Sequence, residues 1–139
     1  MYTRRTMGLP PRRSETAFAV LAFAISFLLY LRTLYPGLNG IGDTPKFQFV
    51  GKVLGTPHPP GYPVHTLLGW LFAQLPFGNL AWRINLLSAV SASFAVVLVF
   101  VLTRRLGASA PAALAAALSF ACGPVFWSQA TLRPCCWPW

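Results

Sequence analysis

The chain has 139 residues, of which 55% are hydrophobic and only 9% charged, and its formal charge is +9. Soluble domains have about a quarter of their residues charged, so this composition excludes an ordinary soluble domain and indicates a protein embedded in lipid. The basic residues lie beside apolar runs rather than along one solvated face. We therefore expect membrane lipid, and not nucleic acid, as the partner of this charge.

Three apolar segments have the length needed to cross a bilayer, which takes about 20 residues. They are residues 17–34, 84–105 and 110–127. A basic tail, residues 1–16, precedes the first span, and no small-residue cleavage pattern follows it, so we read the span as an uncleaved anchor. The sequence predicts an all-α, polytopic protein of the cell (inner) membrane with a cytoplasmic N-terminus.

A fourth apolar segment, residues 64–75, is short for a span. If it does not cross, the N-terminal arginines and Arg104–Arg105 share the cytoplasmic side. If it crosses, Arg104 and Arg105 fall outside, against the positive-inside tendency. We therefore predict an interfacial or re-entrant helix here, within an outer loop of residues 35–83.

The outer loop begins with the pattern of a short surface helix. Thr44 is a suitable N-cap, Pro45 suits the first helical position, and Gly55 is a natural stop. Within it, Gln48 and Lys52 share a polar face four residues apart. The sequence predicts an amphipathic helix lying on the membrane surface.

A proline-rich segment follows, and it contains Pro57, Pro59, Pro60 and Pro63. Each proline fixes φ and removes a donor, which predicts a stiff, extended linker. Pro63 can open the next helix. The loop is then two membrane-surface helices joined by a rigid elbow that carries His58 and Tyr62.

Asp43 is one of only two carboxylates in the chain, and the other, Glu15, belongs to the basic tail. Acid–base chemistry would therefore depend on Asp43, although an aspartate here can also simply cap the helix. His58 is either a turn residue at the headgroup level or a substrate-facing imidazole, which exchanges protons near neutral pH.

Two blocks of this loop resemble a known membrane-protein family. They are GDTPKFQFVGKVLGTPHPPGYP, residues 42–63, and LPFGNLAWRINLLSA, residues 75–89; the resemblance extends over about residues 31–129. The family includes bacterial members of unknown function and a transmembrane O-mannosyltransferase of animals, and it is placed among the GT-C glycosyltransferases. The resemblance implies the N-terminal part of a GT-C fold and transfer of a mannose-like hexose from a polyprenyl-phosphate carrier. The acceptor lies on the outer face, and a protein is one candidate.

The resemblance also implies roles for individual residues. Asp43 matches the catalytic acid of the family's first outer loop, while Lys46 stands where many relatives have a second acid. This departure argues against a two-carboxylate or metal-centred mechanism, and we expect no metal and no cofactor. Asp43 and His58 are the catalytic candidates. The candidates for binding substrate or phosphate are Lys46, Lys52, Tyr62 and Arg83.

Each of these candidates has a simpler alternative. The basic side chains can contact anionic headgroups, and tryptophans at the ends of spans form interfacial belts. Asn85, Ser88 and Ser91 are expected to hydrogen-bond between helices rather than to bind substrate.

Residues 128–139 form a tail of different composition, ending in RPCCWPW. It suggests a truncated or frame-shifted fragment, which we expect to be inactive alone. Two other possibilities stay open: a non-catalytic multi-pass subunit or transporter fragment, and a product without function.

Overall fold

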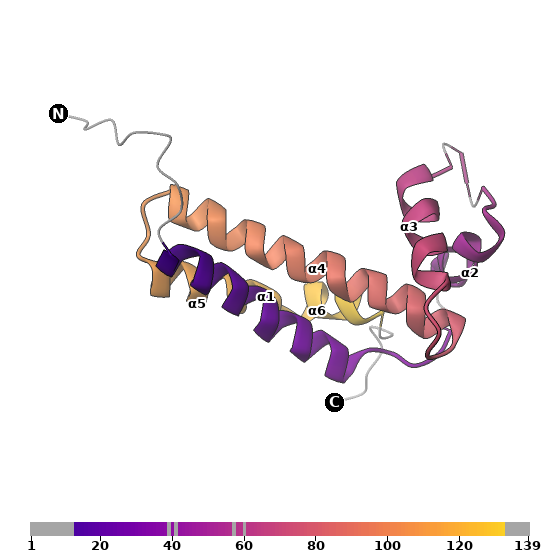
Figure 1. Cartoon of the computed structure of the whole chain (residues 1–139), viewed down its shortest axis with the longest axis horizontal. Coiled ribbons are helices and arrows are strands. Elements are labelled where there is room, and N and C mark those ends of the chain that lie inside the picture. The colour runs from indigo at the N-terminus through magenta and orange to yellow at the C-terminus, as the bar shows by residue number, and fades with distance from the viewer. Residues whose placement is uncertain (1–12, 39, 41, 57, 60, 133–139) are drawn as a thin grey trace.

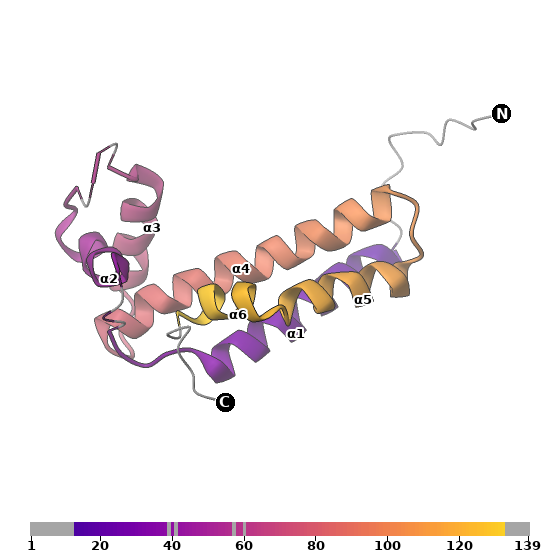
Figure 2. The same ribbon diagram turned by 180° about the vertical axis from the view of Figure 1, so that it is seen from behind.

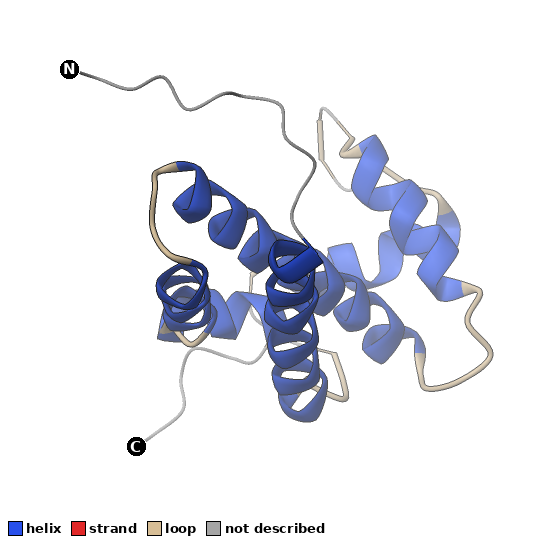
Figure 3. Ribbon diagram, turned by 60° about the vertical axis from the view of Figure 1, so that its left-hand side comes forward, coloured by secondary structure: helices blue, strands red, loops and turns tan. Residues whose placement is uncertain are grey.

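The computed structural model describes residues 13–38, 40, 42–56, 58–59 and 61–132. These residues form helices and loops and no strand, which confirms the all-α prediction (Figures 1 and 3). The basic residues 1–12 and the final residues 133–139 of the two predicted tails lie outside the described residues. The helices are α1 (Arg13–Thr33), α2 (Thr44–Val53), α3 (Pro63–Ala73), α4 (Leu80–Arg105), α5 (Ala110–Ala121) and α6 (Pro124–Thr131).

The long helices α1 and α4 run side by side in opposite directions, with α5 and α6 along the same bundle (Figures 1 and 2). At a rise of 1.5 Å per residue, α1 is about 31 Å long and α4 about 39 Å long. Both are long and apolar enough to cross a membrane. Together with the apolar α5–α6 pair, they make the chain a polytopic membrane protein.

Small side chains allow the three bundle helices to approach closely. Ala113, Ala117 and Ala121 lie four residues apart on α5, and each is completely buried. On α1, Ala22 and Ser26 are also completely buried. Lipid tails are as apolar as leucine, so close packing of small residues, rather than escape from water, holds such helices together.

The third predicted span, residues 110–127, is not one helix. It is divided at Cys122–Gly123 into α5 and α6, whose axes differ by 68°. Pro124 has no N–H to continue the helical hydrogen bonds, so the ladder stops there. The buried Tyr30 hydroxyl of α1 donates to the free carbonyl of Ala121 at 3.0 Å, which satisfies an acceptor that the break exposes.

The second predicted span begins four residues earlier than expected, at Leu80 rather than residue 84. Asn79 accounts for the difference, because its side-chain oxygen accepts a hydrogen bond of 2.8 Å from the Trp82 amide. This is the standard N-cap interaction. It places Trp82 and Arg83 within the first turn of α4.

The two ends of the bundle differ in character. At one end, the start of α1 meets the end of α4 through an ion pair between Glu15 and Arg104, and Arg104 also donates to the Ala108 carbonyl. Helices α2 and α3 gather at the opposite end (Figure 1). With 11 residues, α3 is only about 16 Å long, too short to cross a bilayer. Arg104 and the start of α1 lie at the same end of the bundle, as expected if residues 64–75 do not cross the membrane.

Helices α2 and α3 cross in direct backbone contact at Gly51 and Gly69. A β-carbon added to Gly51 would lie 2.6 Å from the Gly69 carbonyl carbon and 2.8 Å from the Trp70 nitrogen. Both neighbours are backbone atoms and cannot turn aside. The glycine is therefore required by the crossing itself.

Gly51→Ala should force α2 and α3 apart and cost roughly 1–3 kcal/mol, as overpacking of a tight contact does. Gly40→Ala is the matched control, because a β-carbon at Gly40 meets no atom within 4 Å. Hydrogen exchange of α2 and α3 in lipid nanodiscs would measure the effect. Equal protection in the two variants would contradict the close crossing.

Candidate active site

The Asp43 side chain is directed to two neighbouring basic side chains, Lys46 and His58, rather than to the helix end. The backbone carbonyl of Asp43 accepts from the amides of Lys46 at 3.0 Å and Phe47 at 3.3 Å, which begins α2. Its side chain makes no capping hydrogen bond. The predicted Thr44 N-cap is wrong by one residue, since Asp43 holds that position. The carboxylate itself remains available for other contacts.

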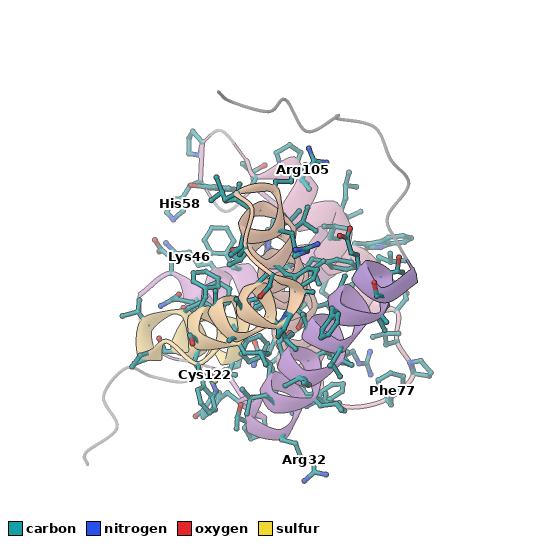
Figure 4. The ribbon with its side chains drawn as sticks, turned by 90° about the vertical axis from the view of Figure 1, so that its left-hand side faces the viewer. Arg32, Lys46, His58, Phe77, Arg105 and Cys122 are labelled. Atoms are coloured by element: carbon teal, nitrogen blue, oxygen red, sulfur yellow. The ribbon has the colours of Figure 1, made fainter. Side chains whose placement is uncertain are left out.

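Both oxygens of this carboxylate have a basic neighbour. Lys46 Nζ donates to Oδ1 at 2.9 Å, and His58 Nε2 lies 3.3 Å from Oδ2. The side chains of Asp43 and Lys46 are a little over half exposed, at 56% and 55%. Lys46 and His58 project on the same flank of the molecule (Figure 4). The structure thus brings together three of the predicted site residues.

His58 reaches Asp43 because the elbow turns back, and the predicted extended linker is wrong in this respect. The Gly61 amide donates to the His58 carbonyl, closing a turn. Gly61 and Tyr62 have φ values of 98° and 47°. Prolines fix only their own φ angles, so the glycine between them can reverse the chain. Helix α3 then begins at Pro63, as expected.

Tyr62 joins the site through an aromatic contact that the sequence did not reveal. The Phe47 ring meets the rings of Tyr62 and His65 edge to face, each at a centroid distance of 5.2 Å. His65 Nε2 also lies 3.4 Å from the Phe47 carbonyl. Edge-to-face contacts of this kind stabilise a fixed ring orientation. Tyr62 keeps 46% of its surface exposed beside the first turn of α2.

The charge environment sets the protonation of Asp43. The hydrogen bond from Lys46, and after it the contact with His58, hold the pKa of the Asp43 carboxyl below its ordinary value. The group is therefore ionised at neutral pH. Asp43, Lys46 and His58 therefore form a compact cluster. Its carboxylate can accept a proton, and its basic side chains can bind an anion.

Arg83 and Lys52 lie apart from this cluster. The Arg83 guanidinium donates to the carbonyls of Ala73, Phe77 and Gly78, each at 2.9 Å. It closes the C-terminal end of α3 and the corner before α4. Lys52 is exposed in the last turn of α2. These contacts favour a structural role for Arg83 over the predicted phosphate contact.

The cluster does not fit a metal ion. Within the described ranges, no three His, Cys, Asp or Glu side chains gather as ligands. The Lys46 ammonium already lies on Asp43 Oδ1, where it would repel a divalent cation. We derive no chemical step through a metal.

The fold and the site define a polytopic, all-helical membrane protein with a carboxylate–lysine–histidine cluster on short helices at one end of its bundle. The chain belongs to the family described as the protein O-mannosyl-transferase TMEM260 N-terminal domain, whose sequence model matches residues 43–133. The matched region begins at Asp43 and includes both blocks that carried the resemblance, apart from Gly42 at the start of the first. The family predicted from the sequence is confirmed.

Two relatives show how much of such a protein this chain represents. It is 30% identical over 119 residues to the protein O-mannosyl-transferase tmem260 of Dictyostelium discoideum, covering 84% of this chain and 14% of that protein. It is 35% identical over 119 residues to the protein O-mannosyl-transferase TMEM260 of Mus musculus, covering 85% of this chain and 17% of that protein. The chain therefore spans about a sixth of these relatives. No solved structure matches it.

Replacing Lys46 should raise the pKa of Asp43. Lys46→Met removes the largest cause of the depressed value, so the carboxyl should titrate nearer its ordinary pKa; Lys52→Met, on the same helix, should leave it unchanged. Because the folded-state pKa is depressed, the pair stabilises α2 above the ordinary aspartate pKa, and this contribution disappears as pH falls through the folded value. Carboxyl ¹³C shifts followed over pH would test this, and an equal pKa in both variants would refute it.

Arg83→Lys should destabilise the corner between α3 and α4, because one ammonium cannot reach three carbonyls in the same geometry. The expected loss is on the order of 2 kcal/mol, the scale of hydrogen bonds to a charged group. Arg105→Lys, at an exposed position with the charge conserved, is the control. Thermal unfolding in detergent would show the difference. If Arg83→Lys melts like the wild type but binds a polyprenyl phosphate less tightly, the phosphate role stands instead.

Proposed function

We propose that the chain is the N-terminal part of an integral-membrane glycosyltransferase. The complete enzyme moves a mannose-like hexose from a polyprenyl-phosphate carrier to an acceptor on the outer face, with a protein hydroxyl as the leading candidate. The observation that carries the proposal is the Asp43 carboxylate, which is exposed, ionised and not used as a helix cap. Family membership supports the reaction class, because both relatives are named protein O-mannosyl-transferases.

In the proposed reaction Asp43 acts as the base, and Lys46 and His58 lie beside it. An acceptor hydroxyl oxygen forms a bond to the sugar's anomeric carbon, and its proton passes to Asp43. The bond between that carbon and the phosphate oxygen breaks, and the polyprenyl phosphate leaves with the electron pair. Proton removal by a positioned carboxylate contributes about 10²–10⁴-fold to such reactions.

Lys46 and His58 would receive the departing phosphate. In the resting arrangement both lie against Asp43, at 2.9 and 3.3 Å, and Lys46 lowers the pKa of the base. A phosphate competes with the carboxylate for the ammonium, since charge-assisted hydrogen bonds to phosphate are strong. When Lys46 moves to the phosphate, the pKa of Asp43 rises and the carboxylate becomes a better base. The donor would thus activate the group that its transfer requires.

The transporter alternative finds no support in the bundle core. A transport path is marked by ionisable or polar groups that face a cavity or one another within the spans. The buried Ser26 and Ser93 instead donate to carbonyls of their own helices, Ala22 and Ala89, each at 2.8 Å. We therefore favour glycosyl transfer.

Asp43→Asn in the full-length enzyme should reduce hexose transfer by about 10²–10⁴-fold, because the amide is the same size and cannot accept the proton. Transfer from a radiolabelled polyprenyl-phosphate mannose in isolated membranes is the measurement, with Arg105→Lys, at an exposed position and with the charge conserved, as the control. Wild-type rates in Asp43→Asn would exclude Asp43 as the base. If the wild-type enzyme transfers a different sugar from its polyprenyl phosphate and does not transfer mannose, the proposed donor is wrong but the reaction class stands.

A further inference from the structure

We propose that Gln48 and Asn85 form a buried amide clamp that positions Asp43 for the transfer reaction. The inference rests on the proposed function, because the clamp matters for catalysis only if Asp43 is catalytic. Neither residue touches the cluster, so each is a positioning residue. The proposal follows from the hydrogen bonds that join three separate segments of the chain.

The first segment is the linker that follows α1. Residues 35–37 lie outside any helix, so their carbonyls need other partners. Side-chain amides supply them: Asn85 Nδ2 donates to Tyr35 at 2.9 Å and Asn79 Nδ2 donates to Pro36 at 2.8 Å. The Gly37 carbonyl accepts from both Gln48 Nε2 and Asn85 Nδ2, each at 3.3 Å. Amides of α2 and α4 therefore take the place of backbone donors.

The clamp itself joins α2 to α4. Gln48 Nε2 donates to Asn85 Oδ1 at 2.6 Å, and the two side chains are 1% and 0% exposed. The prediction that Asn85 hydrogen-bonds between helices is confirmed. Gln48 and Lys52 were predicted to share a polar face of α2, but Lys52 is exposed while the Gln48 amide is buried against Asn85.

Burial makes the clamp selective for one arrangement. Burying an amide without a hydrogen-bond partner is unfavourable, so any shift of α2 that separates Gln48 from Asn85 is penalised. Two leucines could be buried in the same place. However, α2 could then slide along α4, and the linker carbonyls would have no donors. The amides therefore select a unique register of α2 on α4.

This register fixes the carboxylate. Asp43 is five residues before Gln48, at the N-terminal end of the same short helix, and Lys46 lies between them. The linker held at Tyr35 and Gly37 precedes Asp43 in the chain. Asn85 thus holds both α2 and the linker that precedes it. A displacement of about 1 Å in such a group can cost 10²-fold in rate.

The chemistry of a carboxyl group gives a sharp test at Asn85. In Asn85→Asp, the ionised side chain has no donor and places negative charge against the carbonyls of Tyr35 and Gly37. The protonated form regains a donor for the Tyr35 carbonyl and keeps an acceptor for Gln48. Burial favours the neutral form and raises the pKa of such a carboxyl from its ordinary value toward neutral pH.

The transfer assay uses the full-length enzyme with this chain as its N-terminal segment. At pH 8, Asn85→Asp should lower kcat about 10²-fold with little change in KM, and its rate relative to the wild type should recover as pH falls toward 5. Asn85→Leu should show the loss without recovery. Ser93→Ala is the matched control, since it removes another fully buried polar group of α4 whose hydrogen bond stays within the helix.

Hydrogen exchange of the chain itself, in nanodiscs, gives a second readout that needs no activity. Residues 42–50 should lose protection in Asn85→Asp at pH 8 and regain it at low pH, relative to the wild type at the same pH. A relative rate and protection that do not vary with pH in Asn85→Asp would overturn the clamp. If the clamp responds as expected in exchange but Asp43→Asn retains full transfer activity, the catalytic role of Asp43 fails and the positioning of the carboxylate stands.

Discussion

The hydrogen bond between the Gln48 and Asn85 amides is the constraint on which the end of the molecule formed by α2 and α3 depends. It lies where the linker, α2 and α4 meet. Because both amides are buried there, loss of either partner would leave an unsatisfied polar group. Once α2 is fixed, the backbone contact between Gly51 and Gly69 fixes α3, and Arg83 closes α3 onto α4. The elbow between α2 and α3 then has to turn, and the turn carries His58 to Asp43.

The bundle beneath this unit is built by different physics. Rows of alanine and serine let α1, α4 and α5 pack closely, and the backbone break between α5 and α6 is satisfied by the Tyr30 hydroxyl. Trp127 of α6 donates to Thr33 at 2.9 Å, so the broken pair is tied to the end of α1. The long helices provide a rigid base in lipid, while the polar contacts concentrate at the end that carries the cluster.

The sequence predicted what depends on local pattern. Apolar length located α1 and α4, and proline positions located the starts of α2 and α3. It could not reveal contacts between distant segments: Gln48 looked like a surface residue because its partner Asn85 is 37 positions away. Nor could it reveal that Arg83 donates to the carbonyls of Ala73, Phe77 and Gly78, because these carbonyls gather around it only when the chain turns between α3 and α4. Residues 110–127 are apolar throughout, so their composition predicted one span. The break between α5 and α6 depends on the backbone geometry at Gly123 and Pro124.

Helices α1 and α4 run from the Arg104 end of the bundle to the end that carries the cluster, so if they cross the membrane the two ends lie on opposite sides, and their sidedness is the most direct test. Single cysteines at two exposed positions, Leu38→Cys in the linker that precedes α2 and Leu106→Cys directly after α4, would be introduced after the native cysteines are replaced by serine. A membrane-impermeant maleimide added to intact cells should label position 38 and leave position 106 unlabelled until the membrane is opened. Labelling of both positions from the same side would contradict the account.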